Sequence, residues 1–368
     1  MAIRIDGSYG EGGGQILRTA LSLSAVLGKE VEIERIRAGR KKPGLRPQHL
    51  TGVRALTQVV GAKVEGDQIG SQSLTFSPGR IEGGIYQFDV AEERGSAGAL
   101  TLVLQVLLLP LCFGPTSSKV MLFGGTHVPW SPPFHYLSMV LLPTLGQMGL
   151  RCEAAIEKWG WYPKGGGIVQ VKVLPLRELR PIDLSARGGL RTITGISALS
   201  NLPTHIALRQ RERAHQRIRE RLGVAPDIQI MDRAPGTGQG TVLFLRLESE
   251  GGLSGFSALG RKGKRAEEVA DEAVDELIEY MDSGRCVDPH LSDQLIPFVA
   301  LAGGKSVFTV SKITRHLLTN IWVVKQFLDV RIEVEGKEGE AGRVEIHPRS
   351  SETLITGRSS PCVLPFPP

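Results

Sequence analysis

Cysteine is scarce in this sequence, and long hydrophobic runs are missing from it. The cysteines are Cys112, Cys152, Cys286 and Cys362. They lie far apart, form no C-x-x-C pair and stand mostly in apolar runs, which indicates buried thiols rather than a zinc site or a disulfide framework. The longest apolar run, Leu102 to Phe113, is too short to span a bilayer, and the N-terminal residues lack a signal-peptide layout. We therefore predict a cytoplasmic protein with no membrane partner.

Aromatic residues are also few, at 5% of the chain against 41% hydrophobic residues, so we expect a mainly aliphatic core. The 368 residues are enough for two or more packed units. Lys and Arg number 44 and Asp and Glu 38, which gives a net charge of +6. This modest excess suits a polyanionic partner but is common in proteins that bind none, so charge alone decides nothing. The oligomeric state stays open.

Helical periodicity alternates with short strand-like runs, which predicts an α/β (α+β) protein. One order of segments, helix, strand, helix, strand, occurs three times, and the second helix of each copy begins with a histidine: His49, His135 and His316. The segments are 15–27, 31–34, 49–60 and 61–65; 100–113, 119–122, 135–148 and 149–153; and 290–301, 306–310, 316–328 and 330–333. The recurrence indicates three copies of one supersecondary unit.

Residues 186–285 break this pattern. They contain strand signals at 192–199, 228–231 and 241–248 and two strongly charged helices at 203–222 and 264–282. We interpret them as a small domain inserted into a large domain that comprises residues 1–185 (the first two repeats) and 286–347 (the third). Residues 348–368, rich in Ser, Gly and Pro, are expected to form a C-terminal surface tail.

Two glycine clusters invite comparison with nucleotide-binding loops. The turn Gly7 to Gln15 lies between a predicted strand and helix and could present backbone N–H groups to phosphate, but a tight connection is the simpler interpretation. It does not satisfy G-x-G-x-x-G. Glu11 within it fits a phosphate site if a divalent cation lies between carboxylate and phosphates. The stretch 303–306 ends like a Walker A motif, but Val299 stands where the first glycine is required, which excludes a P-loop.

The loop of residues 37–49 concentrates basic side chains before a helix start: Arg37, Arg40, Lys41, Lys42 and Arg46. Its glycines and prolines favour a fixed turn. Together with Arg18 on the preceding helix, these arginines could form a pocket for a terminal phosphate. A solvated basic loop is an equal alternative on composition.

Each helix-start histidine has two interpretations. The positive potential of a helix N-terminus keeps an imidazole neutral and nucleophilic, but capping or packing is the simpler role for any one of them. His316 differs because Asp293 and Gln294 of the same repeat, with Lys312 and Arg315 nearby in sequence, could supply charge and hydrogen bonds to a phosphoryl group.

Several longer motifs then point to one family. They are DGSYGEGGGQILR (6–18), RAGRKKPGLRPQHL (37–50), GSAGALTLVLQ (95–105), HLSDQL (290–295) and HLLTNI (316–321). In this order they resemble the successive signatures of the RNA 3′-terminal phosphate cyclases, over nearly the whole chain.

The resemblance implies a large domain of three repeats, each similar to the C-terminal domain of translation initiation factor three, with a small inserted domain. It also implies an ATP-dependent reaction with Mg²⁺ or Mn²⁺. A histidine nitrogen attacks the α-phosphorus of ATP, AMP passes to an RNA 3′-phosphate, and the 2′-hydroxyl closes a 2′,3′-cyclic phosphate. Such covalent catalysis turns a poor leaving group into AMP.

The resemblance assigns roles residue by residue. His316 matches the adenylated nucleophile, and Glu11 matches a carboxylate linked to the metal. The positions that match ATP contacts are Gln105, His290, Leu291, Ser292, Asp293 and Gln294, with Pro132 or Pro133, His290 and Phe256 around the adenine. The positions that match the RNA phosphate site are Arg18, Arg37, Arg40, Gln48 and His49. His290 departs from relatives that have tyrosine there, although its ring can also stack.

Three alternatives compete with this hypothesis. One is the non-catalytic cyclase-like branch of ribosome assembly, which lacks the nucleophilic histidine. The second is an RNA-binding module without turnover. The third is an enolpyruvyl transferase, whose fold has similar repeats but which does not require His316 together with the basic loop.

Overall fold

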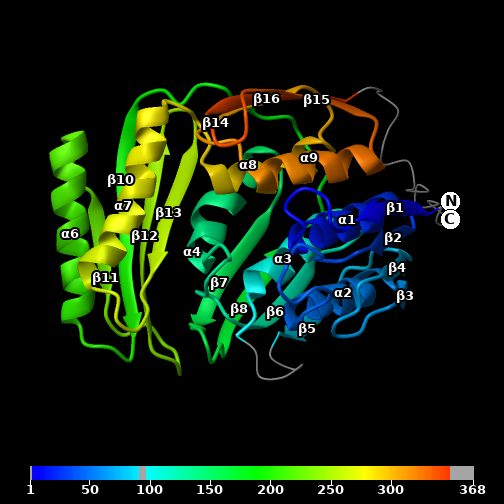
Figure 1. The fold of residues 1–368 in the computed structure, drawn as a ribbon, viewed down its shortest axis with the longest axis horizontal. Helices are drawn as coiled ribbons and strands as arrows, with labels where there is room; N and C mark the ends of the chain where they lie inside the picture. The colour runs from blue at the N-terminus through cyan, green and yellow to red at the C-terminus, as the bar shows by residue number, and fades with distance from the viewer. Residues whose placement is uncertain (1, 91–96, 349–368) are drawn as a thin grey trace, which may run out of the picture.

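The computed structural model describes residues 2–90 and 97–348. The predicted tail beyond residue 348 and Cys362 lie outside the described residues. Of the other cysteines, Cys112 and Cys286 are buried and Cys152 is half-buried, as expected for thiols in apolar runs. The described residues form four four-stranded sheets with helices packed on them, which confirms a mixed α/β protein (Figure 1).

The first sheet has the order β1-β2-β4-β3. Its strands are β1 (Ile3–Asp6), β2 (Val31–Glu34), β3 (Lys63–Glu65) and β4 (Leu74–Ser77), and its helices are α1 (Gly14–Leu27) and α2 (Pro47–Val60). β1 pairs with β2 in parallel, and the other two pairings are antiparallel.

The second sheet has the order β5-β6-β8-β7. Its elements are β5 (Ile85–Asp89), α3 (Leu100–Cys112), β6 (Ser118–Gly124), α4 (Phe134–Tyr136), η1 (Leu137–Leu141), α5 (Leu142–Gln147), β7 (Cys152–Lys158) and β8 (Gly167–Val173). Again the first pairing is parallel and the next two are antiparallel.

The third sheet has the order β15-β16-β14-β9. Its elements are β9 (Asp183–Leu184), α8 (Pro289–Val299), β14 (Ser306–Val310), α9 (Arg315–Phe327), β15 (Val330–Glu335) and β16 (Gly342–Pro348). β9 pairs with β14 in parallel, and the other pairings are antiparallel. Three sheets therefore share the same pattern of one parallel pairing followed by two antiparallel pairings. The sequence had placed residues 183–184 with the second repeat, whereas the structure places them in the third sheet.

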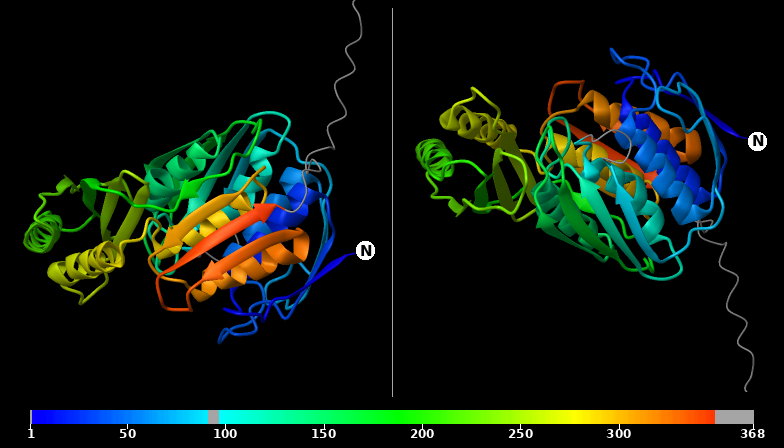
Figure 2. Two further views of the ribbon diagram at one scale, coloured as in Figure 1. Left: turned by 90° about the horizontal axis from the view of Figure 1, so that it is seen from above. Right: turned by 90° about the horizontal axis from the view of Figure 1, so that it is seen from below.

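The fourth sheet, of order β11-β10-β12-β13, lies to one side of the others (Figures 1 and 2). It comprises β10 (Leu190–Ser200), β11 (Asp227–Met231), β12 (Gly240–Ser249) and β13 (Leu253–Leu259), with α6 (His205–Leu222) and α7 (Ala266–Ser283). A separate hydrophobic cluster fills the space between this sheet and its helices. The strand β13 was not predicted, because its segment LSGFSAL is short and rich in small residues.

The predicted helix 135–148 forms as one continuous helical run, α4, η1 and α5, in which Leu137–Leu141 is a π-helical turn. Pro143 lacks an N–H and cannot donate to the carbonyl of Met139, so the α-helical ladder fails there. Arg246 Nε on β12 donates to that carbonyl at 3.2 Å instead. The Met139 carbonyl that Pro143 leaves free thus joins this helix to the fourth sheet.

The site is positioned by helices from all three similar sheets. α1 packs against α3 and α9, and α8 packs against α9, so the helices meet in the interior between the sheets (Figure 1). A single hydrophobic cluster runs through these units. Polar side chains at adjoining helix ends are therefore brought together although they lie up to 300 residues apart in sequence.

Candidate functional site

The glycine-rich turn between β1 and α1 lies against the first turns of α9. Gly10 has φ of +55°, and a Cβ there would lie 2.3 Å from Thr319 Oγ1. The next residue, Glu11, donates its backbone N–H to the same oxygen at 3.2 Å. The left-handed backbone and the close approach together require glycine at position 10. The turn is therefore fixed on the helix that carries His316.

His316 is the second residue of α9, whose start is capped by Thr314 Oγ1 accepting from Leu317 N at 3.1 Å. Its Nδ1 lies 2.6 Å from Gln15 Oε1. The Gln15 amide nitrogen donates to Asp293 Oδ2, which fixes the amide with its oxygen toward the imidazole. Because an amide oxygen only accepts, Nδ1 carries the proton and Nε2 keeps its lone pair. The arrangement therefore prepares Nε2 as a nucleophile.

The charges around His316 favour the neutral ring. Burial of its packed side and then the positive charges of Arg18, Arg40 and His290 lower the pKa of His316 to about 4. The side chain nevertheless keeps 51% of its surface exposed, so a ligand can reach it. The sequence predicted a neutral imidazole from the helix start, whereas burial and the neighbouring cations lower the pKa of His316 here.

A buried charge pair lies behind Gln15. Burial raises the pKa of Asp293 to about 7, although His290, Arg18 and the Gln15 hydrogen bond oppose the rise. Burial likewise lowers the pKa of Arg18 to about 10, opposed by the charge of Asp293. Each group limits the desolvation cost of the other.

The two carboxylate oxygens of Glu11 differ in their contacts. Its carboxylate contacts the Arg40 guanidinium through Oε1, while Oε2 lies 4.0 Å from His316 Nδ1. Oε2 is buried and has no hydrogen-bond partner among the described residues. A Cβ on Gly13 would lie 2.0 Å from this oxygen, so glycine makes room for the carboxylate. An unpartnered carboxylate oxygen fits a hard divalent cation.

Three of the residues expected at the RNA phosphate converge here. A Cβ on Gly14 would lie 2.3 Å from His49 Nε2 and 3.2 Å from Arg18 Nη1, so both side chains stand over the start of α1. His49 Nδ1 accepts from Arg46 N at 3.2 Å, which leaves the proton on Nε2. Burial and then the nearby arginines, Arg37 first, keep the pKa of His49 well below its usual value. Arg40 lies beside Glu11. An anion bound here would therefore meet one neutral hydrogen-bond donor, His49 Nε2–H, and two cationic donors, Arg18 and Arg40.

The other two expected phosphate residues make structural contacts. Arg37 Nη1 donates to the carbonyls of Lys42 and Gly44 at 2.9 and 2.8 Å, which holds the basic loop in shape. Gln48 Oε1 accepts from Ala99 N at 3.3 Å, at the start of α3. The basic loop is thus a fixed, hydrogen-bonded turn.

A pocket between α1, α3, α8 and α9 brings together part of the expected ATP site. Its lining includes Gln15, Arg18, Gln105, Asp293 and Gln294. Gln105 Nε2 donates to Gln294 Oε1 at 2.8 Å, which joins α3 to α8. The pocket therefore adjoins the hydrogen-bonded chain that ends at His316.

The remaining ATP candidates differ in access. His290 is exposed at the start of α8, with its ring edge-on to Tyr136 at 6.2 Å between centroids. Pro132 is half-buried, and its carbonyl accepts from Thr101 Oγ1 at 2.9 Å, one turn before Gln105. Leu291, Ser292 and Pro133 are buried. Only His290 and Pro132 of this group present surface to a ligand.

Three side chains lie where the sequence hypotheses did not place them. Phe256 is 3% exposed and packs in the core of the fourth sheet, 5.3 Å from the Tyr280 ring, so the structure does not bring it to the pocket. Lys312 pairs with Glu279 at 2.7 Å, and Arg315 pairs with Glu338 at 3.0 Å. These two cations serve ion pairs at the surface rather than the pocket.

Sequence reasoning gave no role to Gln15 or Asn320. Asn320 Nδ2 donates to the carbonyl of Asp293 at 2.7 Å and its Oδ1 accepts from Thr19 Oγ1 at 2.6 Å, so it ties α1, α8 and α9 together. Both residues stand inside the quoted motifs. Only their contacts, across about 300 residues, reveal what they do.

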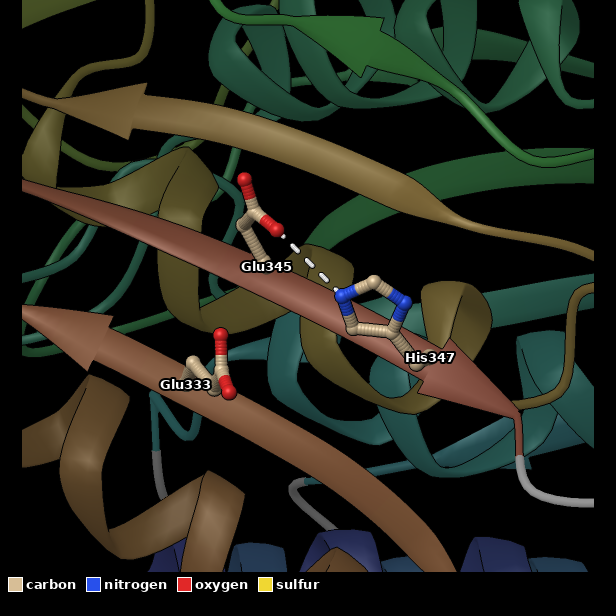
Figure 3. A group of neighbouring side chains, drawn as sticks. All are labelled: Glu333, Glu345 and His347. Atoms are coloured by element: carbon tan, nitrogen blue, oxygen red, sulfur yellow. Dashed lines mark hydrogen bonds and ion pairs between the residues drawn. The ribbon is translucent and has the colours of Figure 1, made fainter.

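A second group of metal-type ligands lies on the third sheet, outside this pocket. Figure 3 shows Glu345 and His347 on β16 beside Glu333 on β15, with ligand atoms within 4.8 Å of one another. Glu345 already accepts from Lys305 at 2.9 Å, from Arg343 and from His347 at 3.3 Å. These donors, Lys305 first, lower the pKa of Glu345 to about 2. Because its carboxylate is neutralised by protein cations, we do not assign a metal here.

The described helices include none that is both long and apolar enough to cross a membrane. The fold and the site thus define a mixed α/β protein whose interior helices present a neutral, accessible imidazole among arginines and an open carboxylate oxygen.

Comparison with known proteins identifies the family. The family model for RNA 3′-terminal phosphate cyclase matches residues 9–334. Proteins of that name from Methanopyrus kandleri and Methylococcus capsulatus are 43% and 47% identical to this chain, each over 94% of it and over 99% and 96% of their own lengths. One from Thermococcus onnurineus is 47% identical, over 94% of this chain and 98% of its own. The chain belongs to the RNA 3′-terminal phosphate cyclase family and is an enzyme of that type.

A solved structure of the enolpyruvyl transferase NikO from Streptomyces tendae matches 96% of this chain and 49% of its own. At 10% identity and a TM-score of 0.38, this likeness carries no argument.

Proposed function

We propose that this enzyme uses ATP to convert an RNA 3′-terminal phosphate into a 2′,3′-cyclic phosphate through an AMP group bound to His316. The observation that carries the proposal is the hydrogen-bonded chain from Asp293 through Gln15 to His316. That chain leaves Nε2 unprotonated in a side chain that is half-exposed.

The first step forms the covalent intermediate. His316 Nε2 attacks the α-phosphorus of ATP, an N–P bond forms, and the P–O bond to pyrophosphate breaks. The imidazole, now substituted on Nε2, still carries its Nδ1 proton, which Gln15 Oε1 accepts. Gln15 Oε1 therefore stabilises the ring more in the adenylated state than in the free one.

The second and third steps transfer AMP and close the ring. An oxygen of the RNA 3′-phosphate attacks the phosphorus of the adenylate and releases His316 Nε2. The vicinal 2′-hydroxyl then loses its proton, attacks the 3′-phosphorus and expels AMP. Arg18, Arg40 and His49 Nε2–H would hold the 3′-phosphate during these steps.

A divalent cation, Mg²⁺ or Mn²⁺, fits beside Glu11 Oε2, where it would neutralise the triphosphate charge. The buried oxygen without a hydrogen-bond donor supports that position among the described residues. The pocket lined by Gln105, Asp293 and Gln294 has a volume of about 50 Å³, which is too small for a nucleotide. We propose that the nucleotide lies at the mouth of this pocket, with Pro132 and His290 as further candidate contacts.

We further propose that the three sheets of shared strand order are copies of one unit similar to the C-terminal domain of translation initiation factor three, with residues 186–285 as an inserted domain. The common parallel and antiparallel pairings support this, and so does the separate core of the fourth sheet. A cytoplasmic location stays a prediction.

Incubation with ATP labelled at the α-phosphate tests the proposal. We expect acid-labile AMP on the wild-type protein and none on His316→Ala, with both variants checked for folding by circular dichroism. Absence of protein-bound AMP would leave a non-catalytic RNA-binding function, and equal labelling of His316→Ala would place the nucleophile elsewhere.

Arg40→Ala separates the two halves of the reaction. If Arg40 serves the RNA phosphate, transfer of AMP to an RNA 3′-phosphate should fall more than self-adenylation does, by roughly 10- to 100-fold for a charge-assisted hydrogen bond. Equal loss in both steps would show that Arg40 acts on ATP or only maintains the loop.

A further inference from the structure

An aromatic pair stands on the surface beside the glycine-rich turn. Tyr9 and Trp322 are stacked flat, with ring centroids 4.1 Å apart and planes 13° apart. Tyr9 is 44% exposed, while Trp322 packs against the main core. One face of Tyr9 is thus covered by Trp322, which serves as a rigid floor.

The pair is fixed close to His316. Tyr9 comes two residues before Glu11, a separation of at most about 7 Å along the chain. Trp322 lies six residues after His316 on α9, about 9 Å along the helix axis. Between them, Thr319 contacts Gly10 and accepts the Glu11 N–H at 3.2 Å. The stacked rings and the reactive imidazole therefore belong to one bonded assembly.

The chemistry around the ring suits a nucleic acid. Asp6 accepts from Arg35, and the Tyr9 N–H donates to the Asp6 carbonyl at 3.2 Å, so a cation is held next to the turn. Arg40 pairs with Glu11 of the same turn, and Arg18 lies beside Gly14. A nucleobase stacks on an exposed aromatic face, and adjacent cations attract its phosphates.

We propose that the Tyr9 ring, supported by Trp322, is the platform on which the base of the 3′-terminal nucleotide of the RNA stacks. This rests on the proposed cyclase function and names the subsite that receives the nucleoside next to the reacting phosphate. Stacking on a ring is tolerant of base identity, so the platform would position RNA ends of any sequence.

The test measures steady-state cyclisation of an oligoribonucleotide 3′-phosphate by the full-length enzyme. Tyr9→Ala should raise the KM for the RNA roughly 5- to 150-fold, the range that corresponds to stacking of one base, while self-adenylation with ATP stays within about 2-fold of wild type. Tyr9→Phe should restore the KM because it keeps the ring. Ile85→Ala, which removes an 86%-exposed apolar side chain on β5, is the matched control and should change neither quantity.

An RNA without its terminal base completes a thermodynamic cycle. Wild-type enzyme should lose the same factor with this abasic end, and Tyr9→Ala should then lose nothing further. Equal KM values for intact and abasic ends on wild type would overturn the proposal, as would additive losses in the cycle.

A purely structural role for the stack would instead lower self-adenylation in Tyr9→Ala, because Glu11 and Thr319 would shift with the turn. That result would also overturn the proposal. Failure of wild-type protein to form the adenylate at all would contradict the proposed function itself, and the two failures are therefore distinguishable.

Discussion

His316 on α9 and His135 on α4 begin corresponding helices, yet their surroundings differ completely. Each is the second residue of its helix, and in each the pKa is lowered to about 4, with burial as the first cause. His316 is half-exposed and bonded to an amide oxygen. His135 is buried, with Nδ1 2.9 Å from His127 Nε2 and its ring 4.9 Å from Trp159. Burial keeps both imidazoles neutral, and their neighbours differ: an amide oxygen and open surface for His316, packed aromatic rings for His135.

The third histidine of the series shows an intermediate outcome. His49 is buried like His135, but its Nδ1 caps its own helix and its Nε2–H stands over Gly14 among arginines. Similar positions in the three units thus hold the proposed nucleophile, the proposed hydrogen-bond donor to an anion and a packed core residue.

The largest expected effect comes from breaking what distinguishes His316. Gln15→Ala removes the acceptor that keeps the proton on Nδ1 and that stabilises the ring after it becomes charged. We expect self-adenylation to slow by roughly 10- to 100-fold, the value of a hydrogen bond to a charged group. Single-turnover labelling at saturating ATP measures this. Gln15→Glu, which keeps an acceptor, should recover part of the rate, and an unchanged rate in Gln15→Ala would show that the bond has no catalytic role.

A second prediction concerns the packed histidine. The folded pKa of His135 is below the unfolded value of about 6.5, so the folded state binds fewer protons and stability falls as pH drops from about 6.5 toward 4. This group alone would cost on the order of 3 kcal/mol across that window. His135→Phe should flatten the acid branch of the free energy of unfolding, measured by urea denaturation at several pH values.

The same variant sharpens the contrast in function. Because His135 makes no contact with the Gln15 and Asp293 chain, self-adenylation at pH 7.5 should remain near the wild-type rate in His135→Phe. Loss of adenylation in a folded His135→Phe protein would contradict the division of roles between the two histidines.

We expect the smallest effect on stability and activity from ion pairs that are open to solvent. α6 and α7 are joined by a ladder of ion pairs, in which Arg213 contacts Asp271 at 2.7 Å and Arg217 contacts Asp275 at 2.8 Å. Arg213→Ala should leave the free energy of unfolding, measured by urea denaturation, and the rate of adenylation close to the wild-type values, because solvent screens an exposed ion pair. A larger loss of activity would give the fourth sheet a part in catalysis that its geometry does not indicate.

Much of the architecture could be predicted from local patterns. The boundaries of β2, β14 and α9 were recovered to within one residue, because alternation, apolar periodicity and flanking glycines are local signals. The π-helical turn before Pro143 was missed because the Met139 carbonyl that the proline leaves free is bonded by Arg246, about 100 residues away. Strand β9 was not predicted, since two residues carry no pattern of their own.

The candidate site was predictable in its members but not in their contacts. Glu11, Asp293, Gln105 and His316 do converge, directly or through Gln15 and Gln294. The resemblance placed Phe256 at the adenine, whereas burial in the core of the fourth sheet keeps it away. A motif indicates which residues matter, while hydrogen-bond geometry indicates which atom of each is free to react.

The pH dependence of self-adenylation tests the central claim most directly. If neutral His316 with a pKa of about 4 is the nucleophile, the single-turnover rate of Asp293→Asn, which lacks the neighbouring carboxyl with a pKa of about 7, should hold through pH 6.5 and fall only as pH approaches 4, and His316→Ala should bind no AMP at any pH. An apparent pKa near 6.5, or protein-bound AMP on His316→Ala, would contradict this account of the site.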